Sequence, residues 1–192
     1  MAKWEGGRGT ISYSDLPKEM RESLDPSFGA RKRSEEVPPQ PAAPDFELAF
    51  ERGAKTTISG QVFVTTRGAQ NIKLGGVTVA LYSEKNMRNF SQWLVTEGRR
   101  RKDYYIDHNQ PELVAYADYE RWSWLPRSPY RAMTDADGRY VLTHDVTGEF
   151  YVVATGTRLL SDKTEYYVWV VPSATIPPSG ELFLNNANLR ED

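Results

Sequence analysis

The stretch from residue 130 to residue 155 constrains the fold more than any other part of the 192-residue chain. Within residues 140–143 and 150–155, aromatic and β-branched side chains recur at alternate positions, which predicts two β-strands. Asp-Ala-Asp-Gly at 135–138 precedes the first strand, and Thr147-Gly148 separates the two. Because Asp and Gly accept the positive φ that hairpin turns require, we expect a tight turn at each of these places.

Four further segments have the composition of strands. Residues 56–66 and 77–82 alternate apolar and polar positions, and a shorter run follows at 181–185. The run at 164–171 is apolar on both faces, which indicates either burial on both sides or one face covered by inserted helices. Six short strands separated by turn residues are typical of a β-sandwich, so the predicted fold class is mostly β.

The patterns also predict core residues and the end of the fold. The expected core includes Tyr140, Phe150, Val152 and Trp169. Asn residues at 185 and 186 close the last strand, where we expect their side chains to bond backbone groups and end it.

The segment 83–129 interrupts the strand pattern with helical signals. Met87, Phe90 and Leu94 recur at helical spacing, Ser83 is a suitable N-cap, and Gly98 would end this first helix. A second helix is expected to begin within residues 109–112, and prolines 126 and 129 would stop it. The sequence therefore predicts a helical insertion between two strands of the sandwich.

Residues 1–45 have the composition of a leader rather than of a folded domain. They end in the proline-dense linker 37–44, which favours an extended spacer. We expect a disordered leader, followed by one sandwich domain over 46–192. The alternative is a linear motif in which Leu16, Met20 and Leu24 dock on a partner.

Composition excludes several classes of activity. The chain contains no cysteine, which rules out disulfides, thiolate zinc sites and cysteine nucleophiles. A formal net charge of -2 makes nucleic acid an unlikely partner of the whole protein. No apolar run approaches the roughly 20 residues of a membrane helix, and residues 1–7 do not read as a signal peptide. These features leave the compartment open, including an extracytoplasmic or membrane-tethered parent protein.

Four short motifs occur in the order found in one known family. They are Ile-Ser-Gly-Gln-Val at 58–62, Gly-Gly-Val-Thr-Val-Ala-Leu at 75–81, Thr-Asp-Ala-Asp-Gly-Arg-Tyr at 134–140 and Gly-Glu-Phe-Tyr-Val-Val-Ala at 148–154. In these motifs the chain resembles the carboxypeptidase regulatory-like domains, which are transthyretin-like (prealbumin-like) sandwiches. The resemblance implies a seven-stranded Greek-key β-sandwich and a noncatalytic module. The long insertion 83–129 departs from the short turn usual in that family.

No residue pattern predicts a catalytic or metal centre. Asp135 and Asp137 could suggest calcium, but Gly138 comes too early for a calcium loop and a turn is expected instead. His108 and His144 are far apart in the sequence, and both are expected to be solvated loop histidines. No Gly-x-Ser-x-Gly, His-Glu-x-x-His or phosphate-loop motif occurs. We therefore predict no enzyme activity, no cofactor and no metal.

Two groups of residues in the insertion form the candidate binding surface. A basic run beside aromatic rings could contact an anionic partner, although a solvated loop is favoured for it. Aromatic rings near the end of the second helix could bind sugar, although packing of the insertion onto the sheet is favoured for them. The partner we expect is another protein, and a glycan is the alternative. The surface comprises Arg99, Arg100, Arg101, Lys102, Tyr104, Tyr105, Tyr119, Trp122 and Trp124.

Overall fold

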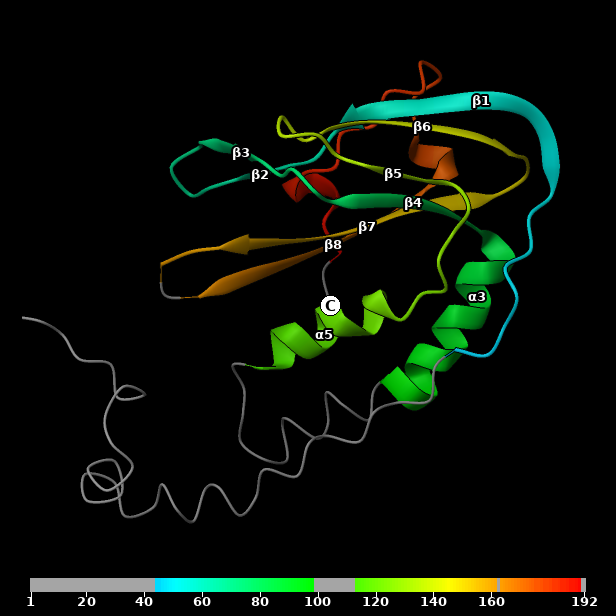
Figure 1. Cartoon of the computed structure of the whole chain (residues 1–192), viewed down its shortest axis with the longest axis horizontal. Coiled ribbons are helices and arrows are strands. Elements are labelled where there is room, and N and C mark those ends of the chain that lie inside the picture. Colours follow the sequence, from blue (N-terminus) through cyan, green and yellow to red (C-terminus); the bar gives the residue numbers. More distant parts are fainter. Residues whose placement is uncertain (1–43, 99–112, 162, 191–192) are drawn as a thin grey trace, which may run out of the picture. The chain divides into compact units, whose positions relative to one another are not determined.

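The computed structural model describes residues 44–98, 113–161 and 163–190, and its architecture is mostly β with a helical insertion (Figure 1). This confirms the predicted fold class. The predicted leader falls outside the described residues except for its last two positions. The strands are β1 (Arg52–Gln61), β2 (Phe63–Thr65), β3 (Asn71–Lys73), β4 (Thr78–Ser83), β5 (Arg131–Met133), β6 (Arg139–Val146), β7 (Phe150–Leu159) and β8 (Thr164–Pro172).

The strands form two layers that pack face to face. One layer contains the antiparallel pair β1–β6, and the other is a four-stranded sheet in the order β5-β4-β7-β8. The strands β2 and β3 pair as a separate short hairpin. Buried side chains from both layers, such as Leu142 and Trp169, meet in one apolar cluster between them. The arrangement is that of a sandwich (Figure 1).

The two strands of the central stretch belong to different layers. β6 pairs with β1, whereas β7 pairs with β4 and β8, so the chain crosses from one layer to the other at Thr147-Gly148. Gly148 has the expected positive φ of 75°, but the turn it makes is a crossover and not a hairpin. Local turn signals predict the bend correctly, yet they carry no information on which strand will be the partner.

The turn before β6 has the predicted geometry. Gly138 has φ 72°, and its backbone N–H donates to the carbonyl of Asp135 at 2.9 Å. The Asp135 carboxylate accepts from the backbone N–H groups of Asp137 and Arg139, at 2.9 and 2.8 Å. Asp135 is thus engaged in holding the turn together, and Asp137 forms an ion pair with Lys73 at 2.9 Å.

The segment following Gly180 extends the β1–β6 layer. It forms single parallel bridges, one with β1 at Ser59–Glu181 and one just past β1 at Val62–Leu184, and not the full strand expected over 181–185. The Leu182 N–H donates to Ser59 O at 2.8 Å, and the Tyr140 hydroxyl donates to Leu182 O at the same distance. This close approach requires Gly60, because a Cβ there would lie 1.8 Å from the Leu182 carbonyl oxygen.

The chain end is fixed by asparagine side chains, as predicted. The Asn185 side chain accepts from the Ala187 N–H at 2.8 Å and caps the short 3-10 turn Asn186–Asn188. Asn186 bonds both backbone groups of Thr65, with its side-chain oxygen 2.6 Å from the Thr65 N.

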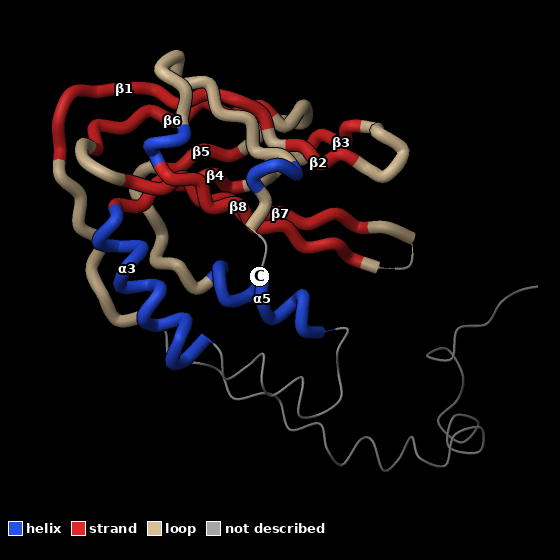
Figure 2. Tube along the Cα trace, turned by 180° about the vertical axis from the view of Figure 1, so that it is seen from behind, coloured by secondary structure: helices blue, strands red, loops and turns tan. Residues whose placement is uncertain are grey.

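The helical insertion packs on the outer face of the four-stranded sheet. It contains α3 (Glu84–Trp93), a π-helical turn (Leu94–Gly98) and α5 (Val114–Ser123), and it occupies the side of the sheet away from β1 and β6 (Figures 1 and 2). Ser83 caps α3 as predicted, because its hydroxyl accepts from the Asn86 N–H at 3.3 Å. The predicted start of the second helix, at 109–112, lies outside the described residues.

A second apolar cluster joins these helices to the sheet. Its buried members are Ala80, Tyr82, Met87, Phe90, Leu94, Trp122 and Val153. Val168 and Val170 of β8 pack against it, while Trp169 faces the sandwich core. β8 is apolar on both faces because one face packs in the core and the other lies under the inserted helices, which was one of the two explanations offered from the sequence.

Residues 44–51 run along α3 before entering β1 (Figure 1). The fully buried Asn86 side chain accepts from the Ala49 N–H at 2.9 Å and donates to the Ala49 carbonyl at 3.1 Å. The Ser83 hydroxyl donates to the same carbonyl at 2.6 Å. Phe46 and Leu48 pack against the helical cluster, so this segment is part of the folded unit.

Of the predicted core residues, Tyr140, Val152 and Trp169 are at most 3% exposed. Phe150 is only half-buried, because it stands at the first position of β7, where the core ends. It packs edge-on against His144 with 5.1 Å between ring centres.

Replacement of Gly60 by Ala tests the closure of the β1 layer. The added methyl group would meet the backbone of Leu182, which has no rotamer by which to move away. We expect Gly60→Ala to lower the free energy of unfolding by about 3 kcal/mol, measured by urea denaturation. Gly68→Ala is the matched control, because its nearest neighbour is 3.9 Å away, and it should be neutral or stabilise by about 0.5 kcal/mol. Equal midpoints for the two variants would contradict the proposed role of Gly60.

Candidate functional site

The structure describes three of the nine residues in the predicted binding surface. Arg99–Lys102, Tyr104 and Tyr105 lie outside the described residues. Of the other three, Trp122 is only 4% exposed, and Tyr119 and Trp124 are half-buried.

These three aromatic rings pack the insertion onto the sheet. Trp122 lies 5.3 Å from Phe90 between ring centres, and the Arg190 guanidinium stands 4.8 Å from the centre of its indole ring. Tyr119 packs against Tyr166 of β8 at 5.2 Å. Trp122 is therefore not part of an exposed aromatic platform, which was the less favoured alternative to packing, because the outer faces of β7 and β8 are apolar and large rings exclude water from them.

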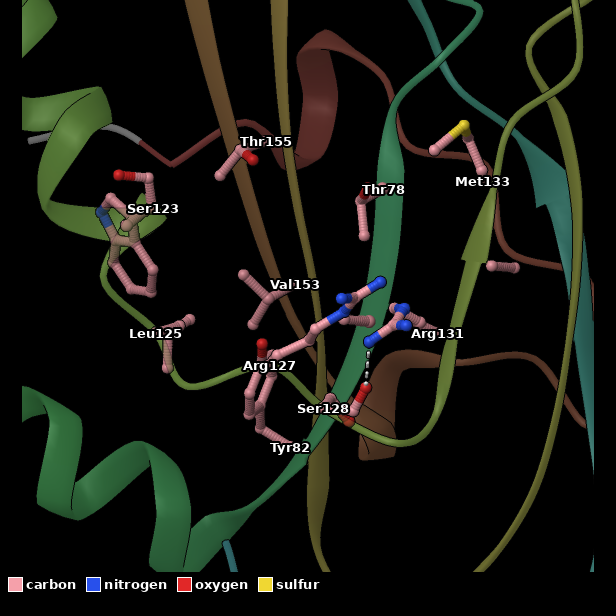
Figure 3. A pocket seen from close by; sticks show the side chains of 13 residues that line it. Thr78, Tyr82, Ser123, Leu125, Arg127, Ser128, Arg131, Met133, Val153 and Thr155 are labelled. Carbon is pink, nitrogen blue, oxygen red and sulfur yellow. Dashed lines mark hydrogen bonds between the residues drawn. The ribbon is translucent and has the colours of Figure 1, made fainter. Parts of the chain in front are cut away.

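A hollow of about 480 Å³ lies on the same face of the sheet, beside the covered area (Figure 3). Its floor is formed by the outward side chains of β4, β5 and β7, and its wall by the end of α5 and the loop that follows it. We call this hollow the β5 groove. It is lined by Thr78, Ala80, Tyr82, Trp122, Ser123, Leu125, Arg127, Ser128, Arg131, Ala132, Met133, Val153 and Thr155.

Strand register places the groove side chains on one face. Arg131 pairs with Ala80, which pairs with Val153, so these three side chains form a row across the sheet. The next row consists of Met133, Thr78 and Thr155. Because side chains alternate between faces along each strand, both rows lie on the face opposite the sandwich core.

The loop 124–130 is held in place by buried hydrogen bonds. The Ser128 hydroxyl, 1% exposed, donates to the Leu81 carbonyl at 2.7 Å and accepts from the Tyr130 N–H at 3.1 Å. The Tyr82 hydroxyl donates to the Pro126 carbonyl at 3.0 Å. These bonds fix the backbone on both sides of Arg127, so its side chain starts from a defined place on the groove wall.

The groove carries positive charge. Arg127 and Arg131 are exposed, line the same hollow and project over the same part of β4 in Figure 3. Arg131 donates to the Ser128 carbonyl at 3.2 Å. Among the described residues that line the groove none is acidic, and no ion pair joins either arginine to another described residue.

Tyr82 remains neutral beside these charges. Burial raises the pKa of Tyr82 to about 12, while its bond to the loop backbone and the nearby Arg131 charge act in the opposite direction. At neutral pH the phenol therefore serves as a hydrogen-bond donor to Pro126 and not as a proton acceptor.

Sequence reasoning did not identify the groove. Arg127 stands between two prolines, and Arg131 follows Tyr130 in a short polar-apolar alternation, without a recognisable motif. The feature that could have indicated the groove was Arg131, a charged residue at an outward position of a short strand. Arg131 becomes part of a groove only because β5 pairs with β4. The two strands are separated by the 47 residues between Ser83 and Arg131, and local patterns do not show that pairing.

His144 is buried and not a solvated loop residue as predicted. It lies on the core face of β6, is 2% exposed, and its Nδ1 accepts from the Val146 N–H at 3.2 Å. The Nε2 atom is buried without a hydrogen-bond partner among the described residues. Burial lowers the pKa of His144, against a smaller opposing effect of the Asp145 charge. The sequence pattern places residue 144 on the same face as Tyr140 and Leu142, which was the signal for burial.

Two further findings concern metals and membranes. Within the described ranges, no group of three or more His, Cys, Asp or Glu side chains is arranged to hold a metal ion. The helices that the structure describes are too short and too polar to span a bilayer.

Comparison with known proteins gives little guidance. No protein-family model matches the chain, and no curated protein matches it. A Pseudomonas aeruginosa protein provisionally described as carbohydrate binding is 20% identical over 76% of this chain and 100% of its own, with a TM-score of 0.36. The Streptococcus pneumoniae pilus backbone protein RrgB is 13% identical, covers 68% of this chain and 40% of its own, and has a TM-score of 0.26. At these TM-scores the likenesses decide neither fold nor function.

The buried histidine generates a prediction about pH. Because the folded-state pKa is lowered, the unfolded chain binds the His144 proton at higher pH than the folded chain does. Stability should therefore fall as the pH decreases from about 7.5 through the ordinary histidine value of about 6.5. Urea denaturation between pH 5 and pH 7.5 measures the effect.

His144→Asn, whose amide oxygen can still accept from Val146, should flatten this dependence. His108→Asn is the matched control, because it removes the other histidine of the chain. Lowered pKa values hold Asp145 and Glu165 ionised, so these carboxylates titrate below this window. A pH profile that is unchanged in His144→Asn would show that another group is responsible.

Proposed function

We propose that this chain is a noncatalytic protein-interaction module whose β5 groove binds an acidic segment of a partner protein. The observation that carries the proposal is the pair Arg127 and Arg131, which line one hollow without an acidic residue among its described lining. Two cations that share a hollow repel each other, and an anion in the groove would relieve that repulsion. Guanidinium groups also suit carboxylates, because they can donate two parallel hydrogen bonds.

The groove also has the apolar surface that a peptide side chain requires. Ala80, Val153 and Leu125 line it together with the hydroxyls of Thr78 and Thr155. Mixed apolar and charged linings are typical of protein-recognition sites, in which apolar contact supplies affinity and charge supplies specificity. An acidic segment that also carries an apolar side chain would fit this combination.

The hydrogen bonding and protonation of the two buried hydroxyls in the groove favour a binding role over catalysis. Ser128 and Tyr82 both bond backbone carbonyls of the fold, and the raised pKa of Tyr82 keeps it protonated. Among the described residues that line the groove, no base stands beside either hydroxyl to activate it as a nucleophile.

We further propose that the sandwich is of the carboxypeptidase regulatory-like, transthyretin-like type. The supporting observation is where the four motifs fall. Residues 58–62 cover the end of β1, and residues 75–81 cover the turn before β4 and its first four positions. Residues 134–140 and 148–154 cover the turns before β6 and β7 and the starts of these strands. The insertion between β4 and β5 then supplies one wall of the groove.

A glycan is the alternative ligand. The sequence-based argument for it required exposed aromatic rings, whereas Trp122 is buried and Tyr119 and Trp124 are half-buried. Hydroxyls and arginines in the β5 groove could still bind an acidic sugar, so a glycan belongs in the test.

The test measures the binding of charged probes to the intact chain by fluorescence anisotropy. The probes are a fluorescein-labelled peptide of alternating Glu and Val, its Lys–Val counterpart and a labelled oligogalacturonate. We expect the Glu peptide to bind and the Lys peptide not to bind. The double variant Arg127→Gln/Arg131→Gln should bind the Glu peptide with an affinity about tenfold lower than that of the unmodified chain. Tight binding of the oligogalacturonate alone would favour the glycan alternative.

The matched control is Arg67→Gln/Arg139→Gln, which makes the same change in net charge at exposed positions outside the groove. It should bind the Glu peptide nearly as well as the unmodified chain, and circular dichroism should show that both double variants are folded. Equal weakening by both double variants would mean that only net charge matters, and the proposed groove would be wrong.

A further inference from the structure

We propose that the acidic partner segment binds as an added β-strand along the free edge of β5. This inference rests on the proposed function of the β5 groove and specifies how the partner is held. The strand would be extended, with an acidic side chain next to Arg131 and an apolar side chain two residues away, next to Met133.

The register of β5 leaves its outer edge with free backbone groups. The Thr134 N–H donates to Val77 O at 2.9 Å, and the Leu81 N–H donates to Tyr130 O at 2.9 Å. Backbone groups of an antiparallel strand alternate between its two sides, so Ala132 also bonds β4. The N–H and C=O groups of Arg131 and Met133 therefore point away from β4.

The two edges of the four-stranded sheet differ. At the β8 edge, the Arg190 N–H donates to Val168 O at 2.9 Å, and Leu189 forms a bridge with Trp169. Residues 189 and 190 thus cover that edge at Val168 and Trp169. At the β5 edge, no described residue bonds the backbone of Arg131 or Met133. An edge with unpaired N–H and C=O groups can accept a further strand.

Side chains at the β5 edge define the chemistry of the partner. Arg131 and Met133 both face the groove, and Met133 is 69% exposed. In an added strand, the residues opposite these two would lie 4.5–5.5 Å away between Cβ atoms, at the distance typical of cross-strand pairs (about 5 Å). Charge pairing then favours Glu or Asp opposite Arg131, and apolar contact favours an aliphatic residue opposite Met133. Arg127 reaches into the groove from the loop and can bond the same carboxylate.

The short length of β5 limits the strength of this interaction. β5 contains three residues, of which two present outward backbone groups. Short edge strands that carry a charge also protect proteins from uncontrolled pairing. Recognition of a charged strand that neutralises Arg131 is compatible with such protection, because an apolar strand would leave the guanidinium unpaired.

The test uses the heptapeptide Thr-Glu-Thr-Val-Thr-Glu-Thr, fluorescein-labelled, with the full chain. Two matched peptides carry N-methyl groups, one at the Glu and Val positions and one at the internal Thr positions. Both keep every side chain but lose the backbone donors on one side of the strand. In strand addition only one side faces β5, so we expect one methylated peptide to bind about tenfold more weakly and the other to bind normally.

The methylated peptide that binds more weakly also reports the direction of the added strand. In an antiparallel pair the residues opposite Arg131 and Met133 bond them directly, so methylation at Glu and Val should weaken binding. In a parallel pair the flanking residues make the bonds, so methylation at Thr should weaken it. Equal binding of all three peptides would overturn strand addition while leaving the acidic groove intact. Failure of the unmodified peptide and of the Glu–Val probe would overturn both.

A variant of the protein makes the same distinction. Met133→Pro removes an N–H that points away from β4, so the pairing of β4 and β5 should survive. We expect Met133→Pro to lower the affinity for the heptapeptide severalfold. Met133→Val keeps the N–H and should bind the heptapeptide nearly as tightly as the unmodified chain does. Equal affinities in folded Met133→Pro and Met133→Val would contradict the proposal, and the methylated peptides remain decisive if Met133→Pro does not fold.

Discussion

Burial of both faces of the four-stranded sheet is the constraint on which the rest of this structure depends. Its inner face packs against β1 and β6 around Trp169, and its outer face would expose Ala80, Tyr82 and Val153 if nothing covered it. Phe90 and Trp122 of the inserted helices remove that surface from water, and complete burial of a large apolar side chain contributes about 1.5–3 kcal/mol. The insertion is therefore a third layer of the fold and not an appendage, and it could not be deleted without exposing the sheet.

Polar side chains hold this third layer in register where apolar contact alone would not. Asn86 and Ser83 bond both backbone groups of Ala49, so the segment before β1 and the start of α3 are fixed to each other. On the opposite side of the insertion, Ser128 bonds the backbones of Leu81 and Tyr130, which sets the entry into β5. Loss of one partner in such buried pairs leaves the other unsatisfied, at a cost of about 1–3 kcal/mol. The wall of the β5 groove is consequently as well defined as the strands that form its floor.

Local patterns predicted the elements of this fold better than their partners. The period-two runs around Tyr140 and Val152, the cap at Ser83 and the turn at Gly138 all follow from short-range preferences, and the structure confirms them. The assignment of β6 and β7 to different layers did not follow, because a turn such as Thr147-Gly148 serves a crossover as well as a hairpin. Burial of His144 was missed for a related reason, since the adjacent Asp145 suggested a loop although the spacing of His144 from Leu142 indicated a core position. The groove could not be predicted from the sequence, because Arg131 and Ala80 become neighbours only through long-range strand pairing.

The position of the groove follows from how the outer face is covered. Apolar rows of β7 and β8 attract the helices, and the aromatic rings of α5 pack there against Tyr166. Toward β5 the rows become mixed, because Thr78, Arg131 and Met133 replace aliphatic residues, and a helix placed over them would have to bury a guanidinium without a partner. Among the described residues, coverage therefore stops between Leu125 and β5, and the same polar side chains that end it line the remaining hollow. In this fold, the residues that limit the described helical layer also place two arginines, Arg127 and Arg131, on the hollow beside it.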